Sequence, residues 1–543
     1  MIGMIKKFSL TGNPWIDNGI TRFICTFENQ PYVSTVKKLP PATYEMEIKD
    51  DKKDKFKEDL ISILKTDLEQ SYILNKHFKI LIKEGLMNSP PNEKDYKFSD
   101  DEISVLKNFE KRYKEEKGKT INFNIKEKKA QVRVQRWNVI APLKEYSERI
   151  ESIVNSFVEE LYSSKVEEEC EECPLCGAKV SKSIDILQNI NPFVTKHHNK
   201  LRGYTGQSGN ERGCSICSLF GLFSALDNFI PYVFVDVKNK ETFVILPLVK
   251  DIEILEKIKK TLNNSLKDFK NKDELNYGTN IKRMLSQDKY SVVVSIYDQM
   301  VNKYAEGEEY FENLKLSEED LSHIYKWVTF NIKSGQAYKM ASFSSIKPTD
   351  SLYGLVKEND EIEPFSDVFK KISDFCKKNQ KDIPFELFSK GIVTLDIGLI
   401  SEFLFTAYKN RDESNGLYLS NEEGFQYFNN LINKIYGGKK MDKNLIEDAK
   451  TFGIHIGNNL TKDIGLMTKL YNVTSKDDLL DVIKESLMKM YKINLKSGNI
   501  QIKEDKVATI INSLNEENWK EIANTIFIFA ALRSINTKIK GCE

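Results

Sequence analysis

Hydrophobic and polar positions follow two different spacings along this chain, the alternation typical of a β-strand and the 3.6-residue repeat of an α-helix. Up to about residue 360 both spacings occur. Residues 19–27 alternate and are rich in Ile, Phe and Thr, which predicts a strand. Residues 52–84 follow helical spacing, and Pro90-Pro91 is expected to break that pattern. Further strands are predicted at Val132 and Val134 and over residues 232–247.

After about residue 361 the pattern is almost entirely helical. Ser475 is expected to cap one helix, with acidic residues in its first turn and an apolar stripe formed by Leu480, Ile483, Leu487 and Met490. The sequence therefore predicts an α+β fold, with a mixed α/β N-terminal part, a four-cysteine zinc insertion and an all-helical C-terminal bundle. The expected regions are 1–165 (with a guide- and motif-proximal loop), 166–220 (the zinc insertion), 221–360 (the remaining α/β part) and 361–543 (the bundle). A chain of 543 residues is too long for one hydrophobic core.

Bulk charge does not select a partner, because 81 Lys and Arg residues nearly balance 80 Asp and Glu residues. The apolar run at residues 526–532 is much shorter than the ~18–20 residues that a membrane span needs. Nothing at the start of the chain resembles a secretory signal. We therefore expect a cytoplasmic protein without a membrane partner.

Two Cys-X-X-Cys pairs, Cys173/Cys176 and Cys214/Cys217, carry the clearest chemistry. Two such turns supply four sulfur ligands to one tetrahedral metal ion, which predicts a zinc site. Four thiolates leave no coordination position for a substrate, so the zinc is expected to be structural. A disulfide is less favoured, since cytosolic thiols stay reduced. Cys170, His197 and His198 are further candidates for a ligand position.

Three stretches are candidates for nucleic-acid contact. Residues 117–136 contain seven Lys or Arg residues against one acid, and a strand there would place Gln131, Arg133 and Gln135 on one face. A solvated amphipathic strand is the alternative. Residues 196–213 combine glycines with basic and amide side chains and could approach a groove, or form a surface insertion. From these two stretches the candidate contacts are Lys128, Lys129, Arg133, Arg136, Lys200, Arg202, Gln207, Asn210 and Arg212.

The third stretch, residues 10–19, contains the turn signals Asn-Pro and Asn-Gly and is expected to form a compact loop that presents Asn13 and Trp15. Composition favours Trp15 as a core anchor over a base-stacking platform.

The segment Thr11-Gly12-Asn13-Pro14-Trp15-Ile16-Asp17-Asn18-Gly19, the two cysteine pairs and the helical C-terminal end together resemble the large subunit of type I CRISPR surveillance complexes (Cascade). The chain is most similar to the type I-B subfamily that carries two Cys-X-X-Cys pairs. The resemblance implies a non-catalytic subunit that recognises the protospacer-adjacent motif on duplex target DNA, contacts the guide RNA and the Cascade backbone and small subunits, and recruits the helicase-nuclease. It also implies that Asn13 and Trp15 lie near the guide handle and motif-proximal DNA. In such proteins the helical end is also made separately as a small subunit, and Met441, after Gly437-Gly438-Lys439-Lys440, is the candidate internal start for a fragment of residues 441–543.

Two other classes of protein remain open. An HNH-type nuclease would use cysteine pairs around His197 and His198 to support a catalytic metal, but the apolar run 218–223 lacks the later His and polar residues that such a site needs. A zinc-containing RNA-binding scaffold unrelated to CRISPR is the third class.

Overall fold

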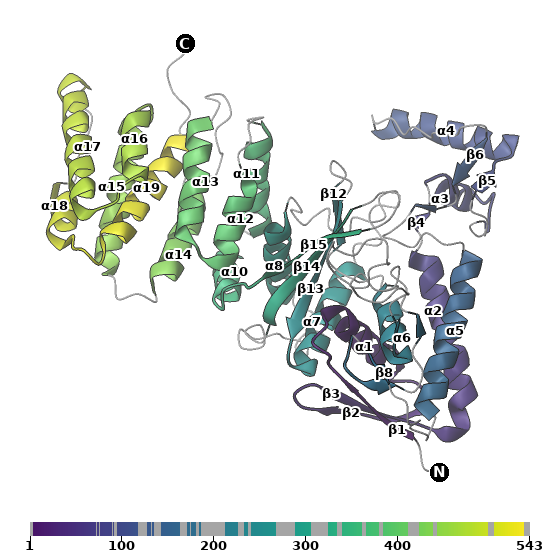
Figure 1. Ribbon diagram of the computed structural model, residues 1–543. Coiled ribbons are helices and arrows are strands. Elements are labelled where there is room, and N and C mark those ends of the chain that lie inside the picture. The colour runs from purple at the N-terminus through teal and green to yellow at the C-terminus, as the bar shows by residue number, and fades with distance from the viewer. Residues whose placement is uncertain are drawn as a thin grey trace, which may run out of the picture. The chain divides into compact units, whose positions relative to one another are not determined.

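The computed structural model divides the chain into two compact units (Figure 1). Unit 1 comprises Met1–Ile281 and Ser322–Ile346, and unit 2 comprises Lys282–Leu321 and Lys347–Glu543. The structure describes residues 4–71, 73–74, 76–88, 91, 95–117, 128–131, 133–134, 143–162, 171–173, 175–180, 184–185, 212–225, 233–236, 241–267, 288–305, 324–333, 339–360, 365–378, 384–410, 423–437, 442–497 and 504–536.

Unit 1 contains two antiparallel sheets and four two-stranded ladders in its described part. The first sheet has the order β1-β3-β2, from β1 (Met4–Ser9), β2 (Val33–Leu39) and β3 (Thr43–Ile48). The second has the order β12-β13-β14-β15, from β12 (Val233–Asp236), β13 (Glu241–Val249), β14 (Ile324–Lys333) and β15 (Lys339–Ile346). The strand prediction for residues 232–247 is confirmed by β12 and β13.

Five helices build the larger core of unit 1: α1 (Pro14–Phe27), α2 (Lys53–Ser71), α5 (Leu143–Tyr162), α6 (Ser215–Ala225) and α7 (Ile252–Lys267). Phe23 of α1 lies within 5.5 Å, centroid to centroid, of both Phe220 and Phe223 of α6. Buried polar groups join the same helices. Asn18 Nδ2 donates to Ser224 Oγ at 3.1 Å, and Lys259 Nζ of α7 donates to Asn18 Oδ1 at 2.8 Å.

The strand predicted at residues 19–27 is wrong, because this segment belongs to α1. Asn13 caps the helix, with Oδ1 accepting from the backbone N–H of Trp15 at 3.1 Å, and Pro14 occupies the first turn, where its missing N–H costs nothing. Gly19, interpreted as a turn residue, serves close helix packing instead. A Cβ on Gly19 would lie 1.9 Å from the Phe220 carbonyl oxygen of α6.

A smaller hydrophobic cluster of unit 1 is built by α3 (Lys76–Lys83), β5 (Asp95–Lys97), α4 (Asp100–Lys117) and β6 (Lys129–Gln131). Phe78, Ile80, Leu81, Phe98 and Leu106 form its buried centre. The helical pattern predicted over residues 52–84 is confirmed by α2 and α3, with β4 (Ile73–Leu74) between them.

The predicted strand with Gln131, Arg133 and Gln135 on one face is divided between two ladders in the described residues. Gln131 belongs to β6 and pairs with Asp95 of β5, whereas Arg133 belongs to β7 (Arg133–Val134) and pairs with Leu74 of β4. The common face of these side chains stays a prediction, since Val132 and Gln135 lie outside the described residues.

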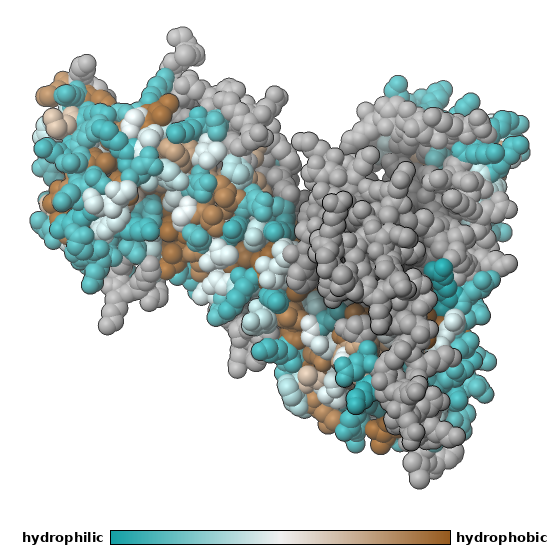
Figure 2. Space-filling view, viewed as in Figure 1, coloured by the Kyte–Doolittle hydropathy of each residue, from teal (hydrophilic) through white to brown (hydrophobic). Residues whose placement is uncertain are grey.

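Unit 2 is all helical in its described part, which confirms the predicted helical bundle and the α+β fold class. Its helices are α8 (Lys289–Ala305), α10 (Leu352–Asp360), α11 (Phe365–Lys378), α12 (Phe385–Thr394), α13 (Ile397–Asn410), α14 (Glu423–Gly437), α15 (Lys443–Asn459), α16 (Ile464–Tyr471), α17 (Lys476–Ser497), α18 (Glu504–Ser513) and α19 (Trp519–Asn536). Hydrophilic residues cover most of the visible surface of α15, α17 and α18 (Figure 2).

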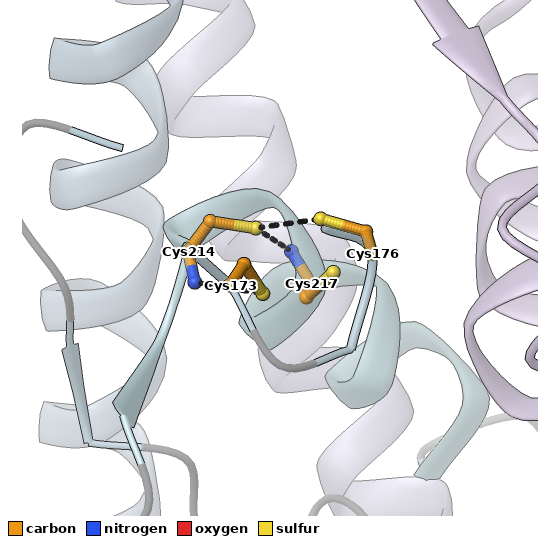
Figure 3. A group of neighbouring side chains, drawn as sticks. All are labelled: Cys173, Cys176, Cys214 and Cys217. Atoms are coloured by element: carbon orange, nitrogen blue, oxygen red, sulfur yellow. Dashed lines mark hydrogen bonds between the residues drawn. The ribbon is translucent and has the colours of Figure 1, made fainter. Parts of the chain in front are cut away.

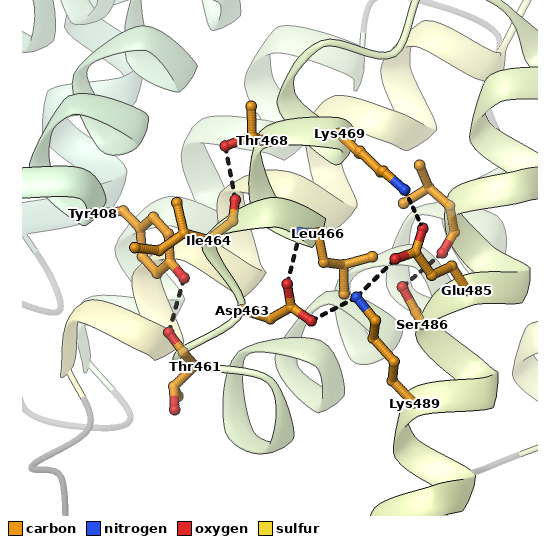
Figure 4. A network of polar contacts seen from close by, with 11 residues as sticks. Tyr408, Thr461, Asp463, Ile464, Leu466, Thr468, Lys469, Glu485, Ser486 and Lys489 are labelled. Carbon is orange, nitrogen blue, oxygen red and sulfur yellow. Dashed lines mark hydrogen bonds and ion pairs between the residues drawn. The ribbon is translucent and has the colours of Figure 1, made fainter.

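The predicted cap of α17 is confirmed, because the N–H of Asp478 donates to Ser475 Oγ at 3.1 Å. Four charged groups then tie α17 to α16 (Figure 4). Lys489 Nζ lies 2.7 Å from Asp463 Oδ2 and 2.7 Å from Glu485 Oε1, and Lys469 Nζ lies 2.7 Å from Glu485 Oε2. Asp463 also caps α16 through the N–H of Leu466 at 2.9 Å.

The chain passes between the two units at 281/282, 321/322 and 346/347, whereas the sequence predicts the start of the helical part at residue 361. Both α10 and the preceding helix α8 belong to unit 2, in which α8 packs against α10, α11 and α12. Sequence periodicity alone missed α8 as part of the bundle because this helix comes before the last two strands of unit 1.

Candidate metal centre

Four cysteines separated in the sequence come together inside unit 1 (Figure 3). The Sγ atoms of Cys173, Cys176, Cys214 and Cys217 all lie within 4.8 Å of one another. The Sγ atoms of Cys176 and Cys214 are 3.8 Å apart, which is too far for a disulfide bond. The predicted four-cysteine set is therefore brought together as one cluster.

The first pair occupies a tight turn between β8 (Glu171–Glu172) and β9 (Lys179–Val180). The N–H of Gly177 donates to the Cys173 carbonyl at 2.8 Å, and the N–H of Cys173 donates to the Ala178 carbonyl at 2.9 Å. These bonds fold the backbone back on itself and point both thiols to the same side.

The second pair lies where β11 (Arg212–Gly213) leads into α6. The N–H of Cys214 donates to Cys173 Sγ at 3.4 Å, and the N–H of Cys217 donates to Cys214 Sγ at 3.2 Å. The first turn of a helix stabilises negative charge, so this position favours thiolates. Ser215 Oγ donates to Glu160 of α5 and fixes the start of α6.

The close packing of the sulfurs changes their acidity. Hydrogen bonds from the thiols of Cys176, Cys214 and Cys217 hold the pKa of Cys173 far below its usual range. Hydrogen bonds to Cys173, Cys176 and Cys214 raise the pKa of the Cys217 thiol, and burial raises it further. Four thiolates at this separation repel one another, so full deprotonation requires a cation at their centre.

The sulfur separations fit a tetrahedral ion. A Zn–S bond of ~2.3 Å gives an S···S edge of about 3.8 Å in a regular tetrahedron, the separation found between Cys176 and Cys214. Cys173, Cys214 and Cys217 are buried, and Cys176 packs against the same core. The cluster can therefore hold a metal ion with four sulfur ligands and is continuous with the hydrophobic core of unit 1. The expected zinc insertion is thus part of that core.

The N-terminal motif has a structural role in the loop before α1. The carboxylate of Asp17 accepts from the N–H of Thr11 at 2.7 Å, from the Thr11 hydroxyl at 2.9 Å and from the N–H of Gly12 at 3.1 Å. Burial raises the pKa of Asp17 to about 6, against the effect of these hydrogen bonds from Thr11 and Gly12. Asn13 is half-buried, and its side-chain oxygen is used in the cap.

The predicted contact between Trp15 and nucleic acid needs correction. Its side chain is 0 % exposed and lies in the core, so it cannot stack on a base in this structure. The core-anchor interpretation from composition is confirmed. The position of Trp15 directly after Asn-Pro, a signal for the start of a helix, could have indicated its burial, because the first turn of α1 faces the interior.

The remaining predicted contacts in the described part of the chain lie on or next to separate ladders. Lys128 is exposed and its Nζ lies 2.5 Å from Asp100 Oδ1, while Lys129 is exposed on β6. Arg133 and Arg212 are placed by their backbone in β7 and β11. Arg136, Lys200, Arg202, Gln207 and Asn210 lie outside the described residues, as do Cys170, His197 and His198.

A second cluster of ligand-type atoms escaped the sequence reasoning. Cys25 and Glu28, at the end of α1, lie with Glu256 of α7 so that their ligand atoms are within 4.8 Å of one another. Lys38 Nζ lies 2.8 Å from Glu256 Oε2 and supplies a positive charge there, and the Tyr44 hydroxyl donates to the same oxygen at 3.2 Å. Only the spacing Cys25-X-X-Glu28 was visible in the sequence, and its partner lies more than 200 residues away.

No family model matches this chain, and no curated protein matches it. No helix in the described part of the chain is both long and apolar enough to cross a membrane.

Proposed function

We propose that Cys173, Cys176, Cys214 and Cys217 hold one structural zinc ion. The observation that carries this proposal is the largely buried set of four sulfurs within 4.8 Å of one another, with Cys176 and Cys214 Sγ at the 3.8 Å edge of a zinc–thiolate tetrahedron. When bound, zinc would neutralise the thiolates and fasten the β8–β9 turn to the start of α6. Elemental analysis of freshly purified protein tests the proposal. About one zinc per chain is expected, and protein without zinc or another bound transition metal would contradict it.

We further propose that the chain is the non-catalytic large subunit of a type I CRISPR surveillance complex acting in the cytoplasm. The ordered occurrence of the Thr11–Gly19 motif, the two cysteine pairs and a C-terminal helical unit supports this function. A four-sulfur site also favours a structural role over a catalytic one, because it offers no open coordination position.

In this function the protein reads a short motif on duplex DNA while base pairing to the guide RNA reads the target sequence. The exposed Lys128 and Lys129 and the basic residues of 196–213 are the proposed contacts to DNA phosphates. Asn13 stays in the proposed contact set near the guide handle, through the loop that precedes the helix it caps. The Cascade backbone, the small subunits and the helicase-nuclease are the proposed protein partners.

The proposal is tested by purifying the tagged protein from cells that express its neighbouring genes. Co-purification of a uniform small RNA with a repeat-derived 5′ end is the expected result. Divalent-metal-dependent cleavage by the isolated protein would instead identify an HNH-type nuclease. A heterogeneous RNA population would identify an RNA-binding scaffold unrelated to CRISPR.

We propose in addition that a second product begins at Met441. Residues 442–536 of such a product would carry α15 to α19, and α15 begins directly after this methionine with Asp442 as its cap. Intact mass measurement on the expressed full gene should reveal a product starting at Met441. A normal set of small subunits after Met441→Ile would contradict this start.

A further inference from the structure

A β-bulge places one aromatic ring on the surface of unit 1. In the β13–β14 pair, Leu248 is opposite Lys326 and Val249 is opposite Ile324, so Tyr325 has no partner in the ladder. The extra residue of a bulge breaks the alternation of side chains and re-aims one of them. Tyr325 is accordingly 51 % exposed, whereas Ile324 is 5 % and Trp327 is 0 % exposed.

The strand around Tyr325 is firmly anchored. Val328 of β14 and Leu246 of β13 belong to the larger core of unit 1, and β14 pairs with strands on both of its sides. Figure 1 shows β14 between β13 and β15. The ring is therefore presented from a rigid element, which lowers the ordering cost of binding a partner.

The ammonium groups of two lysines lie over the exposed ring in cation–π contact. Lys250 Nζ lies 5.1 Å from the centroid of Tyr325, and Lys326 Nζ lies 5.8 Å from it. Neither ammonium group forms an ion pair with a carboxylate in the described part of the chain. The adjacent carboxylate of Asp251 is used to cap α7, where Oδ1 accepts from the N–H of Glu253 at 2.8 Å. Both cations are thus available to an anionic ligand.

We propose that Tyr325, Lys250 and Lys326 form a contact site for single-stranded nucleic acid. One base would stack on the Tyr325 ring, and the flexible lysine stems would carry their ammonium groups to the flanking phosphates. An exposed aromatic ring between unpaired cations matches the alternation of bases and phosphates along a single strand. A polyglutamate chain would use the lysines but has no aromatic ring to stack on Tyr325. This inference rests on the proposed nucleic-acid function, but binding at this site can be measured with the isolated protein.

The test measures binding of the full-length protein to a fluorescein-labelled twelve-nucleotide oligo-dT by fluorescence polarisation at several salt concentrations. Stacking on one base predicts that Tyr325→Ala weakens binding by about 5- to 150-fold, whereas Tyr325→Phe keeps the ring and stays within about twofold of the wild type. Lys250→Gln with Lys326→Gln should reduce the slope of log K against log salt by about 1.4, for two lost phosphate contacts.

A matched control removes two other exposed lysines from unit 1. Lys7 and Lys37 flank Glu45 at 3.5 and 3.9 Å, with side chains 62 % and 63 % exposed. Lys7→Gln with Lys37→Gln changes the net charge equally and should leave the affinity within about twofold. The assignment is overturned if Tyr325→Ala binds like the wild type, if the control pair loses as much affinity as Lys250 and Lys326, or if polyglutamate competes as well as unlabelled oligo-dT.

The test is independent of the proposed Cascade membership. Failure to co-purify a guide RNA would contradict that membership and leave the oligo-dT measurement unaffected. A normal guide-containing complex together with wild-type binding by Tyr325→Ala would reject this site alone.

Discussion

Gly19 of α1 and Phe220 of α6 are in backbone contact: a Cβ added to Gly19 would meet the Phe220 carbonyl oxygen at 1.9 Å and its carbonyl carbon at 2.6 Å. Both atoms belong to a buried helix, so neither can move aside as the end of a flexible side chain could. The same α6 begins at the second cysteine pair, so α1, α6 and the cysteine cluster form one rigid assembly.

Gly19→Ala is expected to destabilise unit 1 by about 3 kcal/mol, because the added methyl group must push the two helices apart. Differential scanning calorimetry of wild type and variant checks this value. Gly465→Ala in α16 is the control, since its Cβ would meet its nearest atom at an ordinary 3.5 Å. The control should be neutral or slightly stabilising, and equal losses in both variants would show that helix contact is not the cause.

Cys217→Ser should remove the metal and lower the melting temperature without abolishing a chemical activity, because it removes one of four ligands at the start of α6. Cys176→Ser should behave alike. Cys376→Ser is the matched control, since Cys376 lies in α11 of unit 2, outside the cluster. A chelator should lower the melting temperature of the wild type and the control while leaving Cys217→Ser nearly unchanged. Unchanged metal content in Cys217→Ser would show that this sulfur is not a ligand.

His77 should make the smaller cluster of unit 1 sensitive to acid. Burial lowers the pKa of His77 to about 4, below its usual 6.5, so the folded state binds fewer protons than the unfolded state between these values. The stabilising effect of this site is therefore complete above about pH 6.5 and is lost as the pH falls toward 4. Hydrogen exchange of α3 and α4, corrected for the intrinsic pH dependence, should show weaker protection at pH 5 than at pH 7. In His77→Phe this extra pH dependence should disappear, and its persistence would assign the effect to another group.

Lys489→Met should weaken the contact between α16 and α17 by up to about 1 kcal/mol, because the lysine bridges two carboxylates on a partly exposed surface. Hydrogen bonds from Lys469 and Lys489 lower the pKa of Glu485. Burial is the largest single influence on the pKa of Asp463 and raises it, but the hydrogen bonds from Lys489 and the Leu466 N–H and the charge of Lys489 together outweigh burial, and the net direction is downward. The stabilisation is thus present at neutral pH and is lost as the pH falls through the lowered carboxyl pKa values. Urea unfolding at pH 7 and pH 3 should show a larger difference between wild type and variant at pH 7 than at pH 3.

The sequence predicted those features whose signal is local. Cysteine spacing identified all four members of the cluster, and Ser475 with its apolar stripe identified α17. The errors arose where a local signal had a distant cause. Asn18-Gly19 has the composition of a turn, but Gly19 is required by a helix that comes 200 residues later. The strand at 19–27 failed for a different reason: Ile16, Ile20, Phe23 and Phe27 also fit helical spacing, so the local pattern was ambiguous. No local pattern could place Glu256 beside Cys25, or show that Tyr325 falls on a bulge, because both depend on register between distant segments.

The order of segments has a consequence for synthesis on the ribosome. Between β13, which ends at Val249, and its neighbour β14, which begins at Ile324, the chain passes through α8 of unit 2. During synthesis, the edge of β13 that pairs with β14 therefore stays unpaired until a helix of the other unit has been translated. A nascent chain stalled at residue 320 would carry an unpaired sheet edge and an α8 whose buried Val292, Val293 and Ile296 have no helices to pack on. A chain that ends after residue 346 has all four strands of the sheet but leaves α8 without the helices that cover it. Loss of the C-terminal helices would therefore create a target for chaperones even though unit 1 could fold.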